Sequence, residues 1–363
     1  MDDLVPPPNE RGSLLYNSVI AGAIPRRPQP QTNDEVKRET PKTDTTELNE
    51  TNANWKLLRV TANAHNGWVR SVCVDPLNTF IASGGADAVI KVWDMTAVNV
   101  KAEITGHILP VRALAVSSRY PYLFSGAEDK TVKCWDLERS HTPHSLVRDY
   151  YGHVGGVYAV ALHPELDLLF TAGRDQVVRV WDIRSRTQVM LLQGHTNDIS
   201  GLATQAMDPQ VISSSMDKTV CLWDLRKEQR ALQITQHSKS VRAIALHPKE
   251  LTFTSGDSAG KYMQWLLPRG QLLQKFATAS PDKIIETMSI NPVTNEIIGG
   301  YANGKLEVWD YVQGISTQTL HSTAVNTTEP SPIFTSAFDM SGSRLYTGEG
   351  DKSIKVWVNG ELD

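Results

Sequence analysis

The side chains of this chain that could do chemistry are a histidine, a hydroxyl residue and an aspartate that recur at fixed spacing. His65, Ser83 and Asp87 form the first set. A hydrolase triad needs these groups, because its hydroxyl nucleophile requires an imidazole base and a carboxylate that orients the base. An active site requires one set in one cleft, whereas this chain contains four complete sets. The repetition therefore favours a structural role within each repeat.

Each set is completed by a tryptophan, which gives the repeat its register. The histidine stands 28 residues before the tryptophan, the hydroxyl residue 10 before it and the aspartate 6 before it. The complete sets are His65, Ser83, Asp87 and Trp93; His107, Ser125, Asp129 and Trp135; His153, Thr171, Asp175 and Trp181; and His195, Ser213, Asp217 and Trp223. Seven tryptophans, from Trp93 to Trp357, follow one another at steps of 42 to 48 residues. A repeat of this length is typical of four-stranded propeller blades.

The segments between these markers predict strands. VRSVCV (69–74), FIAS (80–83) and IKVW (90–93) are short, apolar and rich in β-branched residues. With its Trp-Asp and Gly-His pairs, the chain resembles WD40 repeats over about residues 53–363. The resemblance implies an all-β fold, a seven-bladed WD40 β-propeller, in which each set forms a hydrogen-bonded network inside its blade. It also implies that residues 55–61 (WKLLRVT) form the outer strand of the last blade, since an open ring would leave an unpaired sheet edge.

Two repeats lack the aspartate. In the fifth, Ala259 replaces the aspartate; in the sixth, Asn303 replaces the aspartate, Gly299 the hydroxyl residue and Pro281 the histidine. A missing partner leaves buried polar groups unsatisfied, at about 1–3 kcal/mol each. We therefore expect blades five and six to be the softer part of the ring.

Residues 1–52 are rich in Pro, Thr, Asn, Gln and charge, which predicts a disordered N-terminal tail. The tail contains one apolar group of residues: Leu14, Leu15, Tyr16, Val19 and Ile20. One interpretation is residual hydrophobicity in a solvated tail. The other is a short linear motif that folds on a partner surface.

Composition argues against several classes of protein. The net charge is −4; residues 1–50 hold nine acidic and six basic side chains, which leaves −1 for the rest of the chain. Such a balance gives no general attraction to nucleic acid or membranes. Cys73, Cys134 and Cys221 are odd in number and far apart, so we expect neither disulfides nor a metal site. No apolar run approaches the length of a membrane span, so we predict a soluble intracellular protein.

Another group of residues is predicted to ring the mouth of the central channel. Five residues after the loop histidines stand Arg70, Arg112, Tyr158, Ser200 and Arg242, with Trp68 beside them and with Glu128 and Arg174 just before turn aspartates. Guanidinium groups pair with acidic groups, and aromatic residues anchor interfaces. We therefore predict that these residues form a rim that binds acidic or phosphate groups and peptide partners. The alternative is that its arginines pair with neighbours such as Asp75 or Glu286.

Several stretches outside the repeat framework resemble the pleiotropic regulator 1 family of pre-mRNA splicing factors. They include HNGWVRSVCVDP (65–76), DYYGHVGGVYAVALHPELDLLFTAGRD (149–175), SVRAIALHPKE (240–250) and IFTSAFDMSGSRLYTGEGDKSIKVW (333–357). The resemblance implies a scaffold subunit of the spliceosome in the nucleus. It implies partners in the nineteen complex, which surrounds the U-box splicing ligase. It implies no enzymatic activity, no cofactor and no small-molecule substrate.

The sequence also leaves two alternative partners open, a ubiquitin-ligase adaptor and the RNA backbone. WDIR (181–184) and WDLR (223–226) carry Arg184 and Arg226 at the position where many WD40 substrate receptors bind the adaptor of a cullin-4 ubiquitin ligase. The second alternative is contact with the RNA backbone through the rim arginines. Sequence-specific RNA binding lacks support because the chain shows no strip of basic and aromatic residues.

Overall fold

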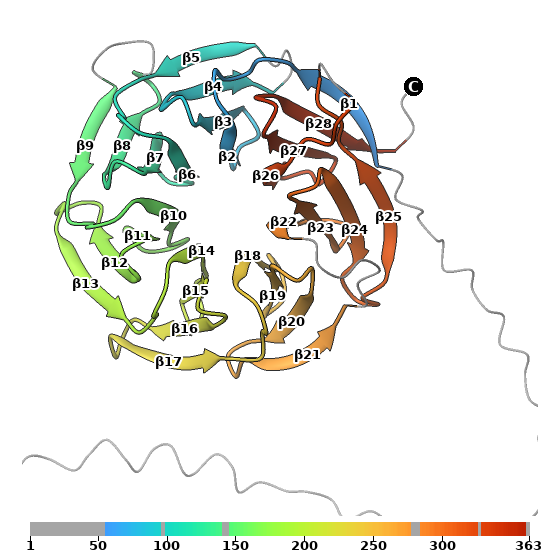
Figure 1. Ribbon diagram of the computed structural model, residues 1–363. Coiled ribbons are helices and arrows are strands. Elements are labelled where there is room, and N and C mark those ends of the chain that lie inside the picture. The colour runs from blue at the N-terminus through green and yellow to red at the C-terminus, as the bar shows by residue number, and fades with distance from the viewer. Residues whose placement is uncertain (1–54, 96–98, 140–144, 277–283, 326–327, 361–363) are drawn as a thin grey trace, which may run out of the picture. The chain divides into compact units, whose positions relative to one another are not determined.

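The computed structural model describes residues 55–95, 99–139, 145–276, 284–325 and 328–360. These residues form 28 strands, which make seven four-stranded antiparallel sheets arranged in a ring (Figure 1). The predicted all-β, seven-bladed propeller is confirmed. In the described ranges, no helix is long and apolar enough to cross a membrane. The predicted disorder of residues 1–52, the apolar group in that tail and Pro281 lie outside the described residues.

The first four blades follow the chain, and each runs from an inner to an outer strand. Blade one contains β2 (Val69–Val74), β3 (Phe80–Gly85), β4 (Ile90–Asp94) and β5 (Val100–Ile104). Blade two contains β6 (Val111–Val116), β7 (Tyr122–Ala127), β8 (Val132–Asp136) and β9 (Leu146–Tyr150). Blade three contains β10 (Val157–Leu162), β11 (Leu168–Gly173), β12 (Val177–Asp182) and β13 (Gln188–Gln193). Blade four contains β14 (Ile199–Thr204), β15 (Val211–Ser215), β16 (Val220–Asp224) and β17 (Gln229–Ile234).

The last three blades complete the ring. Blade five contains β18 (Val241–Leu246), β19 (Thr252–Asp257), β20 (Tyr262–Leu266) and β21 (Gln271–Lys275). Blade six contains β22 (Ile285–Ile290), β23 (Glu296–Tyr301), β24 (Lys305–Asp310) and β25 (Ser316–His321). Blade seven contains β26 (Ile333–Phe338), β27 (Arg344–Glu349), β28 (Ile354–Asn359) and, as its outer strand, β1 (Trp55–Thr61).

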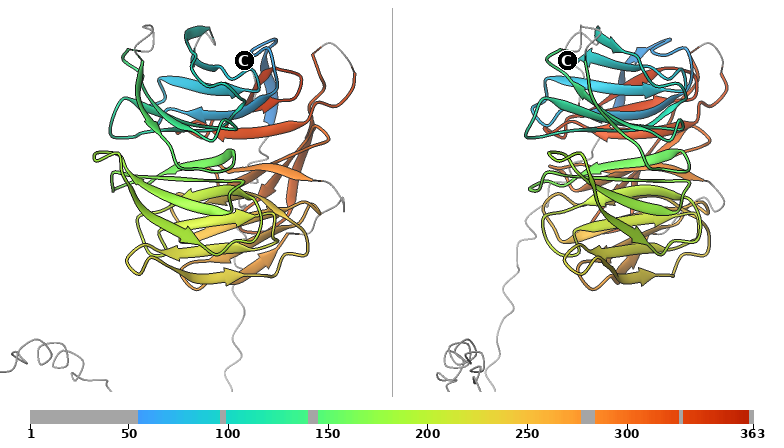
Figure 2. Two further views of the ribbon diagram at one scale, coloured as in Figure 1. Left: turned by 60° about the vertical axis from the view of Figure 1, so that its left-hand side comes forward. Right: turned by 90° about the vertical axis from the view of Figure 1, so that its left-hand side faces the viewer.

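The antiparallel strands give the ring two faces, which are seen from the side in Figure 2. Every innermost strand begins at the face where the loop histidines and the turns between second and third strands lie; we call this the histidine face. The turns between first and second strands and between third and fourth strands lie at the other face, which we call the opposite face.

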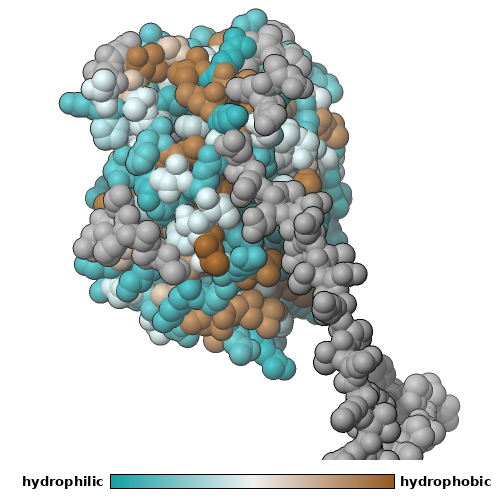
Figure 3. Space-filling model, turned by 90° about the vertical axis from the view of Figure 1, so that its right-hand side faces the viewer, coloured by the Kyte–Doolittle hydropathy of each residue, from teal (hydrophilic) through white to brown (hydrophobic). Residues whose placement is uncertain are grey.

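The core lies between the blades. In blade one, β3 is buried along most of its length, whereas the outer strand β5 exposes most of its residues. Trp135 of blade two packs with Ile90 and Val92 of blade one in one buried cluster. On the outer wall around β25 and β1, apolar surface appears in patches separated by hydrophilic surface (Figure 3). Since each sheet buries its faces against its neighbours, a single blade has no core of its own.

The first strand closes the ring, as the sequence predicted. β1 pairs antiparallel with β28, so that Trp55 lies opposite Asn359 and Thr61 opposite Ile354. Trp55 is 1% exposed. Its backbone N–H donates to Oε1 of Gln318 at 2.8 Å, and its indole N–H donates to Oε2 of Glu296 at 3.2 Å. Trp55 therefore attaches β1 to blade six as well as to blade seven.

We expect Trp55→Ala to lower the free energy of unfolding by about 3–5 kcal/mol, the range for a buried tryptophan replaced by alanine. The physical cause is the lost packing together with the lost indole hydrogen bond to buried Glu296, which keeps only the Thr294 hydroxyl. Urea unfolding of the purified protein measures this. Leu57→Ala is the control, because Leu57 is 42% exposed on the same strand and should change stability by about 0.5 kcal/mol at most. Equal stabilities of the two variants would contradict the role of Trp55.

Candidate functional site

The repeated sets form the expected hydrogen-bonded networks. In blade two, the indole N–H of Trp135 donates to Oγ of Ser125 at 2.7 Å, and Oγ lies 2.7 Å from Nε2 of His107. Nδ1 of His107 lies 2.8 Å from Oδ2 of Asp129. Oδ1 of Asp129 accepts the N–H and O–H of Thr131 at 3.0 and 2.6 Å. The tryptophan, hydroxyl, histidine and aspartate make the same chain of contacts in blades one, three and four.

These sets are closed to a substrate. The hydroxyl residues Ser83, Ser125, Thr171 and Ser213 are all 0% exposed. Each of their oxygens already accepts an indole N–H. Because the would-be nucleophile has no free approach, the arrangement supports the structural interpretation of the motif.

Opposite charges strengthen the hydrogen-bonded network of blade four. Burial opposes protonation of His195, but hydrogen bonding to Asp217 and the nearby Cys221 outweighs burial and raises the pKa of His195 to about 9. Burial would raise the pKa of Asp217, but hydrogen bonds from His195 and Thr219 lower it below its usual range. Near neutral pH blade four therefore holds a charged, hydrogen-bonded pair beside its turn.

Blade five corrects one sequence-based expectation. We expected it to lack a carboxylate because Ala259 occupies the aspartate position. Instead, Asp257 lies two residues earlier, is 0% exposed, and places Oδ2 3.3 Å from Nδ1 of His237. Its Oδ1 accepts the backbone N–H groups of Ala259 and Lys261 at 2.9 and 3.0 Å. The expectation was wrong because a carboxylate at the end of the strand reaches the same histidine as one in the turn.

Blades six and seven use other polar groups. A Cβ at Gly299 would lie 1.8 Å from the hydroxyl oxygen of Tyr262, so the neighbouring blade fills the space of the missing hydroxyl residue. Glu307 in blade six pairs with Lys305 and accepts the hydroxyl of Tyr301, all three being buried. In blade seven, buried Glu349 pairs with Lys355 at 2.7 Å and accepts the hydroxyl of Ser322 at 2.6 Å; the indole of Trp357 donates to Thr347 at 3.1 Å.

We expect Asp257→Ala to lower the unfolding free energy by about 1–3 kcal/mol, as Asp129→Ala should, because each leaves a buried histidine and turn amides without their acceptor. Lys218→Ala, a change in an equivalent turn that removes none of these contacts, is the control. Thermal unfolding monitored by circular dichroism compares the three variants with the parent. If Asp257→Ala unfolds at the same temperature as the parent, the carboxylate does not belong to the network.

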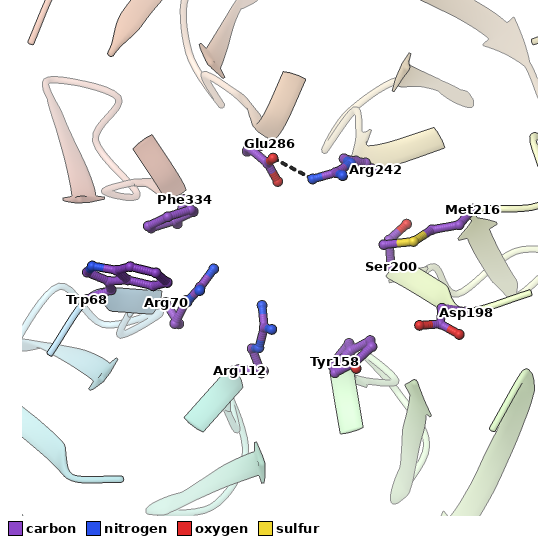
Figure 4. Close-up of a pocket in the computed structure, with 10 residues that line it drawn as sticks. All are labelled: Trp68, Arg70, Arg112, Tyr158, Asp198, Ser200, Met216, Arg242, Glu286 and Phe334. Carbon is purple, nitrogen blue, oxygen red and sulfur yellow. Dashed lines mark hydrogen bonds and ion pairs between the residues drawn. The ribbon is translucent and has the colours of Figure 1, made fainter. Parts of the chain in front are cut away.

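The predicted rim forms a pocket at the inner ends of the blades on the histidine face (Figure 4). The pocket has a volume of about 560 Å³. The residues that the sequence analysis placed here and that line it are Trp68, Arg70, Arg112, Tyr158, Ser200 and Arg242. Glu286, expected only as a possible partner of the rim arginines, also lines the pocket. Three further lining residues were not expected from the sequence: Asp198, Met216 and Phe334. Phe334 could have been found, because it stands at the same strand position as Arg70, one residue after the start of β26.

Arg70 packs against two aromatic rings. Its guanidinium carbon lies 4.7 Å from the ring centroid of Trp68 and 4.2 Å from that of Phe334. No ion pair joins it to a carboxylate among the described residues. Burial, followed by repulsion from Arg112, lowers the pKa of Arg70 from its usual value. An arginine whose charge is balanced neither by a carboxylate nor by full hydration favours an anionic ligand.

The other two rim arginines are already paired, as the alternative interpretation held. Nε of Arg112 lies 2.6 Å from Oε1 of Glu128, and Arg112 also lies over the ring of Tyr158, 5.2 Å from its centroid. Nη1 of Arg242 lies 2.5 Å from Oε1 of Glu286. Asp75 is not a rim partner, because it lies beyond the far end of β2 and pairs with Thr79.

Two predicted rim residues lie elsewhere. Arg174, with Glu128, lines a separate pocket of about 630 Å³ formed by blades two and three. Glu128 stands behind Arg112 rather than in the channel mouth. The position before the turn aspartate does not decide the place by itself, because Met216, its equivalent in blade four, lines the channel-mouth pocket.

Arg184 and Arg226 occupy equivalent places at the opposite face. Nη2 of Arg184 lies 2.6 Å from Oδ2 of Asp167, and Nη2 of Arg226 lies 3.3 Å from Oδ2 of Asp208. Their side chains are 75% and 76% exposed. Both are accessible to a partner that docks on this face.

The cysteines are not poised for chemistry. Cys134 and Cys221 are buried and Cys73 is partly buried, and none forms a disulfide. Burial raises the pKa of the Cys73 and Cys134 thiols to about 12. Within the described ranges, no group of three or more histidine, cysteine, aspartate or glutamate residues is arranged to hold a metal ion.

Comparison with known proteins gives the family. The family model described as "WD domain, G-beta repeat" matches residues 55–94, 99–136, 144–182, 186–224 and 317–358. Over 310 residues the chain is 59% identical to pre-mRNA-splicing factor PRP46 of Debaryomyces hansenii, covering 85% of this chain and 74% of that protein. It is 48% identical to PRP46 of Candida albicans, covering 98% and 95% of the two chains. The chain belongs to the PRP46 and pleiotropic regulator 1 family of WD40 proteins.

More distant members match part of the ring. Human pleiotropic regulator 1 is 40% identical over 117 residues, which cover 32% of this chain and 22% of the human protein. Blade five and most of blade six lie outside the segments that match the WD40 family model. These are the blades in which Asp257 and the Tyr262 hydroxyl replace the usual residues.

Proposed function

We propose that this chain acts in pre-mRNA splicing as a non-enzymatic scaffold of the spliceosome, working in the nucleus within the nineteen complex. Three of its relatives that align over most of the chain are named pre-mRNA-splicing factors, and this observation carries the proposal. Its partners are spliceosomal proteins, which bind the propeller and the tail group of Leu14, Leu15, Tyr16, Val19 and Ile20. No cofactor or small-molecule substrate is required.

The site supports binding rather than catalysis. The hydroxyl, imidazole and carboxylate groups with triad chemistry are buried in the blades. The pocket instead presents Arg70 packed against two rings, one of them the half-exposed Trp68. Aromatic residues and arginine are the types that dominate protein interfaces. The rim residues Trp68, Arg70, Arg112, Tyr158 and Arg242 are therefore the proposed partner-binding surface, flanked by Glu128 and Arg174.

We expect affinity purification of the full-length chain from nuclear extract to enrich spliceosomal proteins, measured by mass spectrometry. A double charge reversal, Arg70→Glu with Arg242→Glu, should deplete the partners of the rim, and deletion of residues 1–40 should deplete those of the tail. The fold of each variant is checked by its melting temperature. Unchanged recovery of every partner by the charge-reversal variant would contradict a binding role for the rim.

A second candidate function is substrate reception for a cullin-4 ubiquitin ligase. The observation in its favour is that Arg184 and Arg226 are exposed at equivalent positions of neighbouring blades on the opposite face. Each arginine also has an intramolecular carboxylate partner, Asp167 or Asp208, which gives both side chains a local role.

We expect the cullin adaptor, if this function holds, to co-purify with the parent and to be lost with the double variant Arg184→Ala and Arg226→Ala. Arg59→Ala, an exposed arginine on β1, serves as the control. Absence of the adaptor from the parent eluate, beside recovered spliceosomal proteins, would reject this function alone.

Contact with the RNA backbone through the rim arginines is the remaining partner hypothesis. Its support is weakened by the ion pairs of Arg112 and Arg242, which leave fewer positive charges free for phosphates.

A further inference from the structure

The charges that line the histidine-face pocket nearly cancel, apart from two groups. Arg112 pairs with Glu128, and Arg242 pairs with Glu286. Arg70 and Asp198 remain: among the described residues, neither is joined to an oppositely charged side chain. Figure 4 shows Asp198 across the pocket from Trp68 and Arg70. The pocket therefore has one free positive wall and one free negative wall.

Arg70 is held in a conformation that suits a carboxylate. Trp68 and Phe334 both lie against its guanidinium, whose carbon is 4.7 and 4.2 Å from the two ring centroids. The two centroids are only 5.8 Å apart, so the rings do not enclose the guanidinium from opposite sides, and N–H groups remain available for a bidentate ion pair. Figure 4 shows this group extending toward the open middle of the pocket. Because the side chain is already ordered, binding an anion loses little of its conformational entropy.

The wall that contains Asp198 adds polar and apolar contacts. Ser200 and Met216 lie next to Asp198 in the pocket lining (Figure 4). The backbone carbonyl of Asp198 is occupied, since it accepts the N–H of Met216 and the hydroxyl of Ser215, both at 2.9 Å. These bonds fix the backbone, while the Asp198 carboxylate stays free for a cation.

The balance of charge favours a protein ligand over a phosphate. The three arginines of the pocket are matched by Asp198, Glu286 and Glu128, so the sum of their formal charges is zero. A phosphate or an RNA strand would bring two or more negative charges against a single unpaired arginine. A peptide with one acidic and one basic side chain matches both walls. The volume, about 560 Å³, is within the range of small-ligand sites and accommodates a few side chains.

We propose that this pocket binds an extended peptide segment of a partner protein, in which an aspartate or glutamate pairs with Arg70 and a lysine or arginine pairs with Asp198. The proposal rests on the proposed function, in that a protein partner docks on the histidine face. It adds the chemistry of the segment that enters the pocket.

The test starts from a phage-displayed library of random 12-residue peptides, selected on the purified full-length chain. Enriched peptides are synthesised, and their affinities are measured by fluorescence polarisation. We expect the enriched peptides to contain an acidic residue with a basic residue nearby. Arg70→Gln should weaken them about tenfold or more, the effect of losing a hydrogen bond to a charged group. Asp198→Asn should weaken them by a similar factor, and Arg59→Gln should leave them unchanged.

Arg70→Gln also removes the stack between Trp68 and Phe334, so thermal melting must show that it is folded. If Arg70→Gln does not fold, two other changes test the same ion pairs. One is Asp198→Asn, and the other is a peptide in which glutamine replaces the acidic residue or norleucine the basic residue. Enrichment of peptides without an acidic residue overturns the proposal, as does affinity unchanged by Arg70→Gln or by Asp198→Asn. Tighter binding of a phosphoserine peptide or of a 12-nucleotide oligouridylate than of the acidic peptides also overturns it.

The proposed scaffold function and the proposed peptide ligand can fail separately. If spliceosomal proteins co-purify with the full-length chain but no acidic peptide binds, the proposed ligand is wrong while the scaffold function stands. If acidic peptides bind through Arg70 and no spliceosomal protein is recovered, the pocket chemistry stands and the proposed function fails.

Discussion

The antiparallel pairing of β1 with β28 is the constraint on which the rest of the ring depends. Each blade buries its faces only against its neighbours, so the ring must close before the last sheet has a partner on both sides. Closure also builds the pocket. Trp68 comes from blade one and Phe334 from blade seven, and their rings, 5.8 Å apart, meet across the seam and hold Arg70. Stability of the seam and order of the candidate site therefore have one physical origin.

The blades differ in the side chains that satisfy their buried hydrogen-bond donors. A turn and an indole N–H are buried at the same place in each sheet and need acceptors. Blades one to four supply a hydroxyl, an imidazole and a turn aspartate. Blade five supplies its carboxylate from the strand end with Asp257, and blade seven uses Glu349 with Lys355. In blade six the Tyr262 hydroxyl of the neighbouring blade only fills the space beside Gly299, and the indole N–H of Trp309 has no hydrogen-bond partner among the described residues. Blade five was expected to lack its carboxylate because only the position six residues before the tryptophan, Ala259, was considered.

The functional surface differs in kind from these networks. Network residues lie at fixed steps in the chain and are satisfied by partners in the same repeat. Pocket residues come from several blades; Arg242 pairs with Glu286 across a blade boundary, whereas Arg112 pairs with Glu128 of its own blade. Because these side chains lie outside the repeated networks, they can differ between proteins that share the WD40 frame.

The sequence by itself determined the blade count, the order of strands, the closing strand and six lining residues of the pocket. The closing strand follows from the resemblance to WD40 repeats. The others follow from local periodicity, because alternation, turn residues and a tryptophan at each step specify a blade wherever they occur. Only the tertiary structure decided which charges are free. Arg112 meets Glu128 of its own blade and Arg242 meets Glu286 of the next, whereas Arg70 meets no carboxylate among the described residues, and a repeat pattern contains no such distances. The tertiary structure likewise moved Arg174 into another pocket and brought Asp198 and Phe334 into this one.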